Sequence, residues 1–360
     1  MHRVCIYVTA HGFGHAARCQ AVAELLLEAG VAVEFRTGAP RWFFDWLLAI
    51  SEQCILRDPG VILDPGVVQS DSFSHDVPAT LHAWQHLLAR ADELCALEAT
   101  YLRGERFDVV VSDVAPLPLA AARQAGLPAV AMGNFTWDWV LEGYLQELPE
   151  FSVVIDGLRA LYSQADLFLR LPMSHPTELF QRERQIDFTT RRSHLPPDQI
   201  RRLLGVDPEH LMVLLSFGGF GVKRLDLQRV SHHRQVRCVW DQGPAQPPAL
   251  ISARGMGLRY TDLVRAADVV LTKPGYSIIS EAVAQQTPLA FAPRRGFRES
   301  SLLESFLRSS WPSLAVEPEA LANGTWIEPV VRWLANRPRI FPHIAVEGAR
   351  QASQAILELA

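Results

Sequence analysis

Apolar runs and amphipathic segments alternate along the first half of the chain. The runs expected to be strands are residues 4–10 (VCIYVTA), 31–38 (VAVEFRTG), 107–113 (FDVVVSD), 128–134 (PAVAMGN) and 165–172 (ADLFLRLP). Between them, residues 16–27 and 116–126 place apolar side chains at helical spacing, and glycine follows each helix. Apolar strands that alternate with helices indicate a parallel sheet covered on both faces.

The same alternation begins again after a polar, basic and proline-punctuated stretch. Residues 173–209 form that stretch and are expected to be a linker. Further apolar runs, expected to be strands and their following turns, lie at residues 210–221, 236–242, 267–275 and 288–293. A helix is predicted over 277–286, between the last two. We therefore predict an α/β protein with Rossmann-like domains at 1–172 and 210–340, and a helical tail at 341–360 that could pack back on the first domain.

The composition narrows the class of protein. A chain of 360 residues with 49% hydrophobic and 20% charged residues is typical of a folded, two-domain protein. The net charge of −5 gives no electrostatic footprint for nucleic acid. The cysteines are odd in number and form no Cys-x-x-Cys pair, which favours free thiols in a reducing compartment. With no apolar run long enough for a signal peptide or membrane span, we expect a cytoplasmic protein.

A glycine-rich turn follows the first strand of each half of the chain. The two turns are HGFGH at residues 11–15 and SFGGFG at residues 216–221, and neither is the G-x-G-x-x-G dinucleotide fingerprint. Glycine lets a ligand approach the backbone, and the start of a following helix offers N–H groups to an anion. A tight strand-to-helix turn also needs glycine for its own sake, so each turn alone is a weak signal.

Several motifs resemble known families. Residues 272–293 (TKPGYSIISEAVAQQTPLAFAP) resemble the donor-site signature of GT-B glycosyltransferases, most closely the group of the peptidoglycan N-acetylglucosaminyltransferase and the diacylglycerol glycosyltransferases. Residues 10–26, 112–139 and 292–300 resemble the glycosyltransferase-like N-terminal region of plant L-arabinokinases and its stand-alone bacterial relatives. No galactokinase-type phosphate loop is found, so kinase activity is not implied. The resemblance implies a GT-B fold, with two Rossmann-like domains facing each other across a cleft.

The same resemblance implies inverting transfer of a sugar from a nucleotide-diphosphate donor, most simply a UDP-sugar, to a hydroxyl acceptor. His15 matches the general base of several GT-B enzymes, and Asp113 matches the aspartate that orients it. Histidine suits this role because it titrates near neutrality and a carboxylate can fix its tautomer. The alternatives are a structural hydrogen bond for His15 and a helix N-cap for Asp113. The sequence contains no Asp-x-Asp pair, so we expect no metal and no cofactor beyond the nucleotide sugar.

The donor contacts that the resemblance implies lie in both glycine turns and in the 272–300 region. Glu281 matches the ribose-binding glutamate, and Arg294, Arg295 and Glu299 are candidates for the donor sugar, although RRGFRES departs from the usual Asp-Gln or Glu-Gln pair. The remaining expected donor contacts are Gly12, Gly14, Ser216, Gly218, Gly219, Lys273, Gly275, Tyr276 and Ser277.

The acceptor contacts are expected near the first turn and in the stretch at 64–76. The candidates are His11, Gln69, Asp71, Asn134 and Trp137. His11 could equally hydrogen-bond within its turn, and core packing is the favoured alternative for Trp137 and Trp139. Residues 40–50 (PRWFFDWLLAI) could contact a membrane surface, but a core-facing helix explains the same pattern and is preferred.

Two other functions remain open at this point. An epimerase or hydrolase on the same scaffold would act on the nucleotide sugar without an acceptor and would use additional carboxylates. A sugar-nucleotide sensor without catalysis is the other, because the relatives include a fusion to a sugar kinase. The presence of both His15 and Asp113 favours catalysis.

Overall fold

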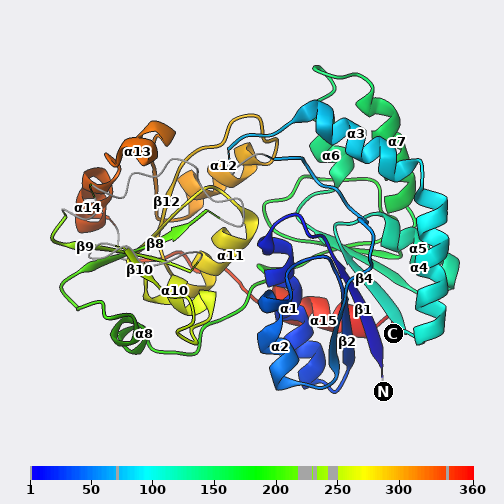
Figure 1. Ribbon diagram of the computed structural model, residues 1–360, viewed down its shortest axis with the longest axis horizontal. Coiled ribbons are helices and arrows are strands. Elements are labelled where there is room, and N and C mark those ends of the chain that lie inside the picture. Colours follow the sequence, from blue (N-terminus) through cyan, green and yellow to red (C-terminus); the bar gives the residue numbers. More distant parts are fainter. Residues whose placement is uncertain (1, 70–72, 218–228, 230–232, 242–249, 338–339) are drawn as a thin grey trace. The chain divides into compact units, whose positions relative to one another are not determined.

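The computed structural model describes residues 2–69, 73–217, 229, 233–241, 250–337 and 340–360. These residues fall into two compact units (Figure 1). The N-terminal unit takes its described residues from 1–70, 74–190 and 345–360, and the C-terminal unit takes them from 71–73 and 191–344. Each unit contains one parallel sheet.

The sheet of the N-terminal unit has the strand order β3-β2-β1-β4-β5-β6-β7, and every neighbouring pair is parallel. Its strands are β1 Arg3–Val8, β2 Ala32–Arg36, β3 Cys54–Arg57, β4 Val109–Asp113, β5 Ala129–Gly133, β6 Leu167–Arg170 and β7 Glu183–Gln185. The central strands β1, β4 and β5 are almost entirely buried, as the apolar runs predict. This order reverses direction beside β1, which places a topological switch point between β1 and β4.

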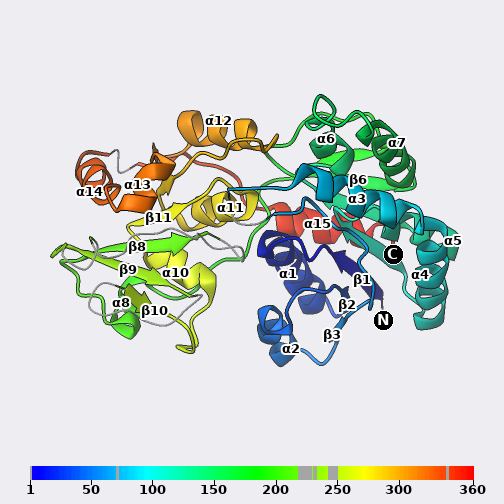
Figure 2. The ribbon, with the colours of Figure 1, turned by 45° about the horizontal axis from the view of Figure 1, so that its top comes forward.

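Helices cover both faces of this sheet (Figures 1 and 2). They are α1 Phe13–Glu28, the 3-10 turn η1 Arg41–Phe43, α2 Asp45–Ile50, α3 Val77–Leu88, α4 Ala91–Glu105, α5 Leu117–Ala125, α6 Trp137–Glu142, α7 Phe151–Tyr162 and α15 Gly348–Leu357. The last of these, α15, packs beside α1 and places Ala352, Ala355 and Ile356 in the core with β1 and β4. The end of the chain is therefore part of the N-terminal unit.

The C-terminal unit has the strand order β10-β9-β8-β11-β12-β13, again with parallel neighbours. Its strands are β8 Leu211–Ser216, β9 Val236–Trp240, β10 Leu250–Ser252, β11 Val269–Thr272, β12 Leu289–Phe291 and β13 Ser313–Ala315. Its described helices are α8 Pro197–Leu204, α10 Tyr260–Ala266, α11 Tyr276–Gln285, α12 Ser300–Ser310, α13 Pro318–Asn323 and α14 Ile327–Asn336. Two Rossmann-like sheets with flanking helices are the predicted α/β class.

The polar stretch at 173–209, expected to be a linker, is instead divided between the units. Its first part contributes β7, which pairs with β6 at the edge of the N-terminal sheet. Its second part contributes α8, which packs against α10 in the C-terminal unit. The stretch is polar because edge strands and surface helices keep one side in water.

Residues 40–50, expected to form a core-facing helix, bury only part of their apolar surface. Phe44 and Leu47 are buried, whereas Trp42 is 59% exposed and Trp46 and Ile50 are each 49% exposed.

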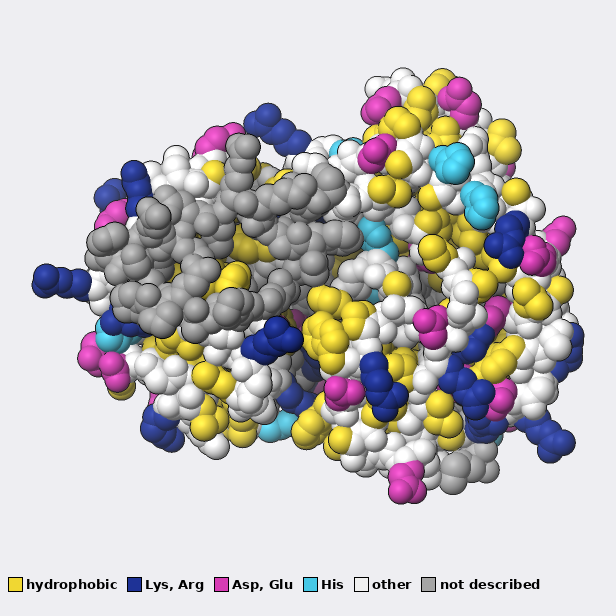
Figure 3. Space-filling model, viewed as in Figure 1, with side chains coloured by type: hydrophobic (Ala, Val, Ile, Leu, Met, Phe, Trp, Pro, Cys, Tyr) yellow, Lys and Arg dark blue, Asp and Glu magenta, His cyan; other side chains and the backbone are white. Residues whose placement is uncertain are grey.

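Among the described residues, no helix is both long and apolar enough to cross a membrane. All five cysteines are buried free thiols. Figure 3 shows acidic and basic side chains interspersed over the face that it displays.

Candidate active site

The first strand-to-helix turn begins where β1 ends, next to the end of β4. Val8 is paired in register with Asp113 of the neighbouring strand. Gly12 has a φ of 92°, which only glycine adopts readily, and it is the N-cap of α1. Helix α1 starts at Phe13, three residues before the expected start at Ala16, because Gly12 completes the turn immediately. His15 therefore lies in the first helical turn, directly above the end of the sheet.

His15 and Asp113 form a buried pair. The Nδ1 atom of His15 is 2.8 Å from Oδ1 of Asp113, and the two residues are 9% and 0% exposed. Burial alone would raise the pKa of the Asp113 carboxyl, but the charges and hydrogen bonds of Arg18 and His15 hold that pKa well below its ordinary value. Asp113 is thus ionised at neutral pH and can act as a fixed negative partner for the imidazole.

Arg18, which the sequence analysis did not assign, is the third member of this cluster. Its Nε donates to Oδ2 of Asp113 at 2.5 Å, and its Nη2 donates to Oδ1 at 2.6 Å. The same Nη2 lies 2.9 Å from Nδ1 of His15. His15 and Arg18 are three residues apart on one face of α1, which is the spacing that could have indicated their proximity.

This arrangement sets the charge of the imidazole. Burial and the neighbouring Arg18 charge lower the pKa of His15, and Asp113 offsets this only in part. The ring is therefore neutral at pH 7. When Nδ1 carries the proton, it donates to Asp113 and leaves the Nε2 lone pair free to accept a proton from another group. A neutral histidine held in one tautomer by a carboxylate is the arrangement that general-base chemistry requires.

Asn134 and Trp137, expected to contact the acceptor, are core residues in the structure. Asn134 is 4% exposed; its Oδ1 accepts from Arg18 and its Nδ2 donates to the carbonyl of Pro172 at 2.7 Å. Trp137 is 2% exposed and packs edge-on against His11 and Phe135. Asn134 thus fixes the position of Arg18, while Trp137 packs against the turn at residues 11–15 through the ring of His11. Trp139 stacks on His175.

His11 and Gln69, two of the candidate acceptor contacts, lie next to each other in the structure. The Nε2 atoms of the two side chains are 3.0 Å apart, and both residues are half-buried. The His11 ring also presses on Gly66, where an added Cβ would lie 2.4 Å from Nδ1. Gly66 has a φ of 62°, so both its backbone and this contact require glycine. Asp71 lies outside the described residues.

In the C-terminal unit, α11 begins at the carboxyl end of β11. Its N-cap is Gly275, which makes no side-chain capping hydrogen bond, and the N–H groups of a first helical turn are the kind of group that binds an anion. Ser216 ends the neighbouring β8; its hydroxyl is bonded by Tyr260, and its carbonyl by the Thr272 hydroxyl. Lys273, Tyr276 and Ser277 are half-buried around this helix start.

Glu281, expected to bind ribose, accepts a hydrogen bond from an arginine in the stretch at 173–209 that was expected to be a linker. Nη2 of Arg191 is 2.8 Å from Oε1 of Glu281, which is 2% exposed. Burial, with the Glu281 charge as a smaller cause, raises the pKa of Asp241 at the end of β9. Arg191 and Asp241 had no assigned role from the sequence, and the charge clustering around Glu281 is visible only in the fold.

The remaining expected donor contacts differ in how far they are exposed to solvent. Arg294 is 9% exposed, lies over the Phe297 ring and is 3.7 Å from Glu299, whereas Arg295 is exposed. Gly14 is half-buried within the first turn of α1. Gly218 and Gly219 lie outside the described residues.

Comparison with known proteins finds relatives in sequence and in structure. No protein-family model matches the chain. The L-arabinokinase of Arabidopsis thaliana is 30% identical over 340 residues, which are 92% of this chain and 32% of that protein. The chain therefore spans about a third of the length of this relative. An uncharacterized glycosyltransferase of Methanopyrus kandleri is 26% identical over 269 residues, covering 67% of this chain and 73% of that protein.

Solved glycosyltransferase structures share this fold. A UDP-glucosyltransferase from Polygonum tinctorium aligns over 99% of this chain and 93% of its own, with a TM-score of 0.61 and 16% identity. Arabidopsis thaliana UGT89C1, solved with UDP-L-rhamnose, aligns over 99% of this chain and 94% of its own, with a TM-score of 0.59 and 14% identity. The chain is a GT-B protein related to L-arabinokinase. In this GT-B protein, His15, Arg18 and Asp113 meet in the N-terminal unit, and the α11 helix start lies in the C-terminal unit.

Proposed function

We propose that this GT-B protein is an inverting, metal-independent glycosyltransferase that moves a sugar from a UDP-sugar to a hydroxyl group of an acceptor. The observation that carries the proposal is the buried contact of 2.8 Å between His15 Nδ1 and Asp113 Oδ1. The names of the relatives support it: one is a glycosyltransferase, and two structural neighbours are a UDP-glucosyltransferase and a protein solved with UDP-L-rhamnose.

His15 is the general base in this proposal. Its Nε2 takes the proton of the acceptor hydroxyl while that oxygen forms a bond to the anomeric carbon of the donor. The bond from the anomeric carbon to the diphosphate oxygen breaks, and UDP leaves with the bonding electron pair. Asp113 stabilises the imidazolium that forms, and Arg18 keeps Asp113 ionised and oriented.

The C-terminal unit binds the leaving group. The N–H groups at the start of α11 stabilise the charge that develops on the diphosphate, which is the role of a preorganised anion site. Because the sequence has no Asp-x-Asp pair, we propose that these N–H groups act in place of a metal ion. Glu281 accepts hydrogen bonds from the ribose hydroxyls, and Arg191 sets the orientation of its carboxylate.

The test has two stages. A panel of UDP-, GDP- and dTDP-sugars is first screened for stabilisation of the protein against heat, because a ligand that binds the folded state raises its melting temperature. Release of UDP from the best donor is then measured with a mixture of hydroxyl acceptors, with and without EDTA. The proposal expects a UDP-sugar hit and acceptor-dependent UDP release that EDTA leaves unchanged. Conversion of the donor to an epimer or to free sugar without acceptor would show an epimerase or hydrolase instead.

A further inference from the structure

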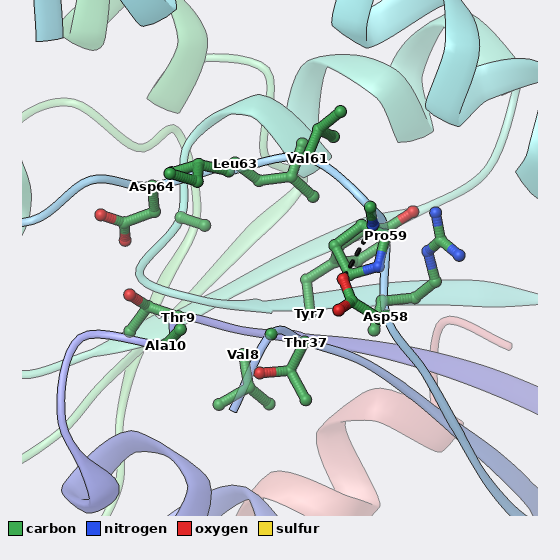
Figure 4. A pocket seen from close by; sticks show the side chains of 15 residues that line it. Tyr7, Val8, Thr9, Ala10, Thr37, Asp58, Pro59, Val61, Leu63 and Asp64 are labelled. Carbon is green, nitrogen blue, oxygen red and sulfur yellow. Dashed lines mark hydrogen bonds between the residues drawn. The ribbon is translucent and has the colours of Figure 1, made fainter. Parts of the chain in front are cut away.

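A pocket of about 350 Å³ opens at the carboxyl ends of β1 and β2 in the N-terminal unit. Its walls come from residues 7–10 after β1, 36–38 after β2 and 58–64 after β3, with Ala115 after β4. Asp64 and Thr9 lie at one end of it and Asp58 and Pro59 at the other (Figure 4). Open α/β sheets bind ligands at this edge. None of the site residues expected from the sequence lines the pocket.

Asp64 is the polar group built most firmly into this pocket. It is 7% exposed, its Oδ2 accepts from Nε1 of Trp137 at 2.6 Å, and its Oδ1 accepts from the N–H of Gly66 at 2.8 Å. The Thr9 hydroxyl is a third partner. A carboxylate has about four acceptor sites, so one remains for a ligand hydroxyl. A buried carboxyl held this tightly is preorganised to bind a hydrogen-bond donor.

The charges around the pocket argue against an anionic ligand. Arg36 is its basic residue, and both its Nη2 and its Nε donate to the carboxylate of Glu98, at 2.5 and 3.1 Å. That ion pair neutralises the guanidinium charge. The carboxyl of Asp58, joined by that of Asp64 once it ionises, is left as the charge beside the pocket, and it would repel a phosphate or carboxylate group.

The rest of the lining is apolar and the volume is small. Pro59, Val61 and Leu63 form an apolar wall opposite the strand ends (Figure 4), and Ile62 adds to the lining. A volume of about 350 Å³ is near the lower limit of small-molecule pockets, which run from about 300 to 1,000 Å³. An apolar wall combined with carboxyl groups at both ends suits a single ring that has an apolar face and hydroxyl groups at its edge.

The pocket and the proposed base lie on either side of a short row of packed side chains. Trp137, which bonds Asp64, packs edge-on against Phe135 with ring centres 5.0 Å apart. Phe135 in turn packs edge-on against His15 with ring centres 6.0 Å apart. Thr9 and Ala10 of the lining also lead directly into the turn that carries His15.

We propose that this pocket holds the acceptor, and that the part of the acceptor it holds is an uncharged polyhydroxylated ring the size of one monosaccharide. Asp64 and Asp58 bind hydroxyl groups of that ring, and the wall at 59–63 covers its apolar face. The inference rests on the proposed function, because it assigns the acceptor of that transfer.

The experiment measures binding of three probes to the full chain by saturation-transfer NMR and calorimetry. Methyl β-D-glucopyranoside is the uncharged sugar ring, glucose 6-phosphate the anionic one, and 4-nitrophenol a flat aromatic ring. Ile62→Trp adds bulk at the rim of the pocket, on a side chain that is 70% exposed, so the fold should tolerate it. Leu97→Trp is the matched control, because Leu97 is 56% exposed on α4, outside the lining.

We expect the methyl glucoside to bind the wild type and Leu97→Trp equally, and Ile62→Trp about tenfold or more weakly. Equal binding to all three proteins, or tighter binding of glucose 6-phosphate or 4-nitrophenol, would overturn the assignment. UDP is titrated into the same samples to separate the two claims. UDP binding with no effect of Ile62→Trp refutes the pocket alone, whereas failure of UDP to bind any of the proteins refutes the proposed function.

Discussion

Replacing Asp64 with asparagine should change how the stability of the protein depends on pH. Burial raises the pKa of the Asp64 carboxyl from 3.8 to about 7, although Trp137, Gly66 and Thr9 donate hydrogen bonds that lower it. Between roughly pH 4 and pH 7, the folded protein therefore holds a proton that the unfolded chain has released. A carboxyl group whose pKa is raised by folding makes the protein less stable as the pH rises through this window.

The size of the effect follows from the width of the window. Each pH unit inside it changes the free energy of unfolding by about 1.4 kcal/mol. The slope falls off near pH 7, where the folded-state carboxyl itself ionises, so from pH 5 to pH 7 ionisation of Asp64 should remove about 2 kcal/mol of stability from the wild type, and the asparagine variant should lose none from this position. Asparagine also gives up one carboxylate acceptor, an offset of about 1–3 kcal/mol that is the same at every pH.

The assay is urea unfolding of both proteins at pH 5, 6, 7 and 8, with Asp58→Asn as the control. Asp58 accepts the same kind of hydrogen bond, from the N–H of Gly60 at 2.8 Å, but it is exposed. The difference between wild type and Asp64→Asn should shift by about 2 kcal/mol in favour of the variant from pH 5 to 7, and the Asp58→Asn difference should stay flat. Parallel pH curves for wild type and Asp64→Asn would refute the reasoning.

Three further substitutions test other parts of the account. Arg18→Gln should raise the pKa of His15, because the guanidinium charge lowers it, and should cost about 3–5 kcal/mol of stability by leaving Asp113 buried without its cation; NMR titration of the His15 ring that shows no rise would contradict this. Glu281→Gln should weaken UDP binding about tenfold or more, since a charge-assisted bond becomes a neutral one; an unchanged dissociation constant from calorimetry would remove Glu281 from the donor site. Arg184→Ala should leave the free energy of unfolding nearly unchanged, because the Arg184–Glu358 pair is exposed; a large loss in urea unfolding would show that this pair anchors α15.

Much of the fold could be predicted because the strongest sequence signals belong to its central elements. β1, β4 and β5 are buried on both faces and therefore read as uninterrupted apolar runs. The edge strands β7 and β13 escape this pattern, since each has three residues and at least one side in contact with water. Local pattern thus finds the middle of a sheet more readily than its edges.

The residues of the candidate site were likewise predicted only in part. His15 and Asp113 were found through the resemblance to GT-B glycosyltransferases, whose base and orienting aspartate they match. Their places after β1 and at the end of β4 agree with that match, because parallel strands end at the same edge of a sheet. Arg18 was missed because helix α1 was expected to start at Ala16, which hid the shared helical face of His15 and Arg18. Asp64 begins the stretch at 64–76 that was expected to contact the acceptor, but it was not singled out, because its burial depends on Trp137, which is 73 residues further along the chain.

The most direct test of the central claim is the turnover of His15→Ala, measured together with its affinity for UDP. If His15 is the general base, turnover should fall by about 10²–10⁴, the usual scale of general-base catalysis, while UDP affinity stays the same. His86→Ala, an exposed histidine on α3, is the matched control and should retain full activity. Near-full activity of His15→Ala would contradict the claim, and loss of activity in His11→Ala instead would assign the base to the other histidine of the turn.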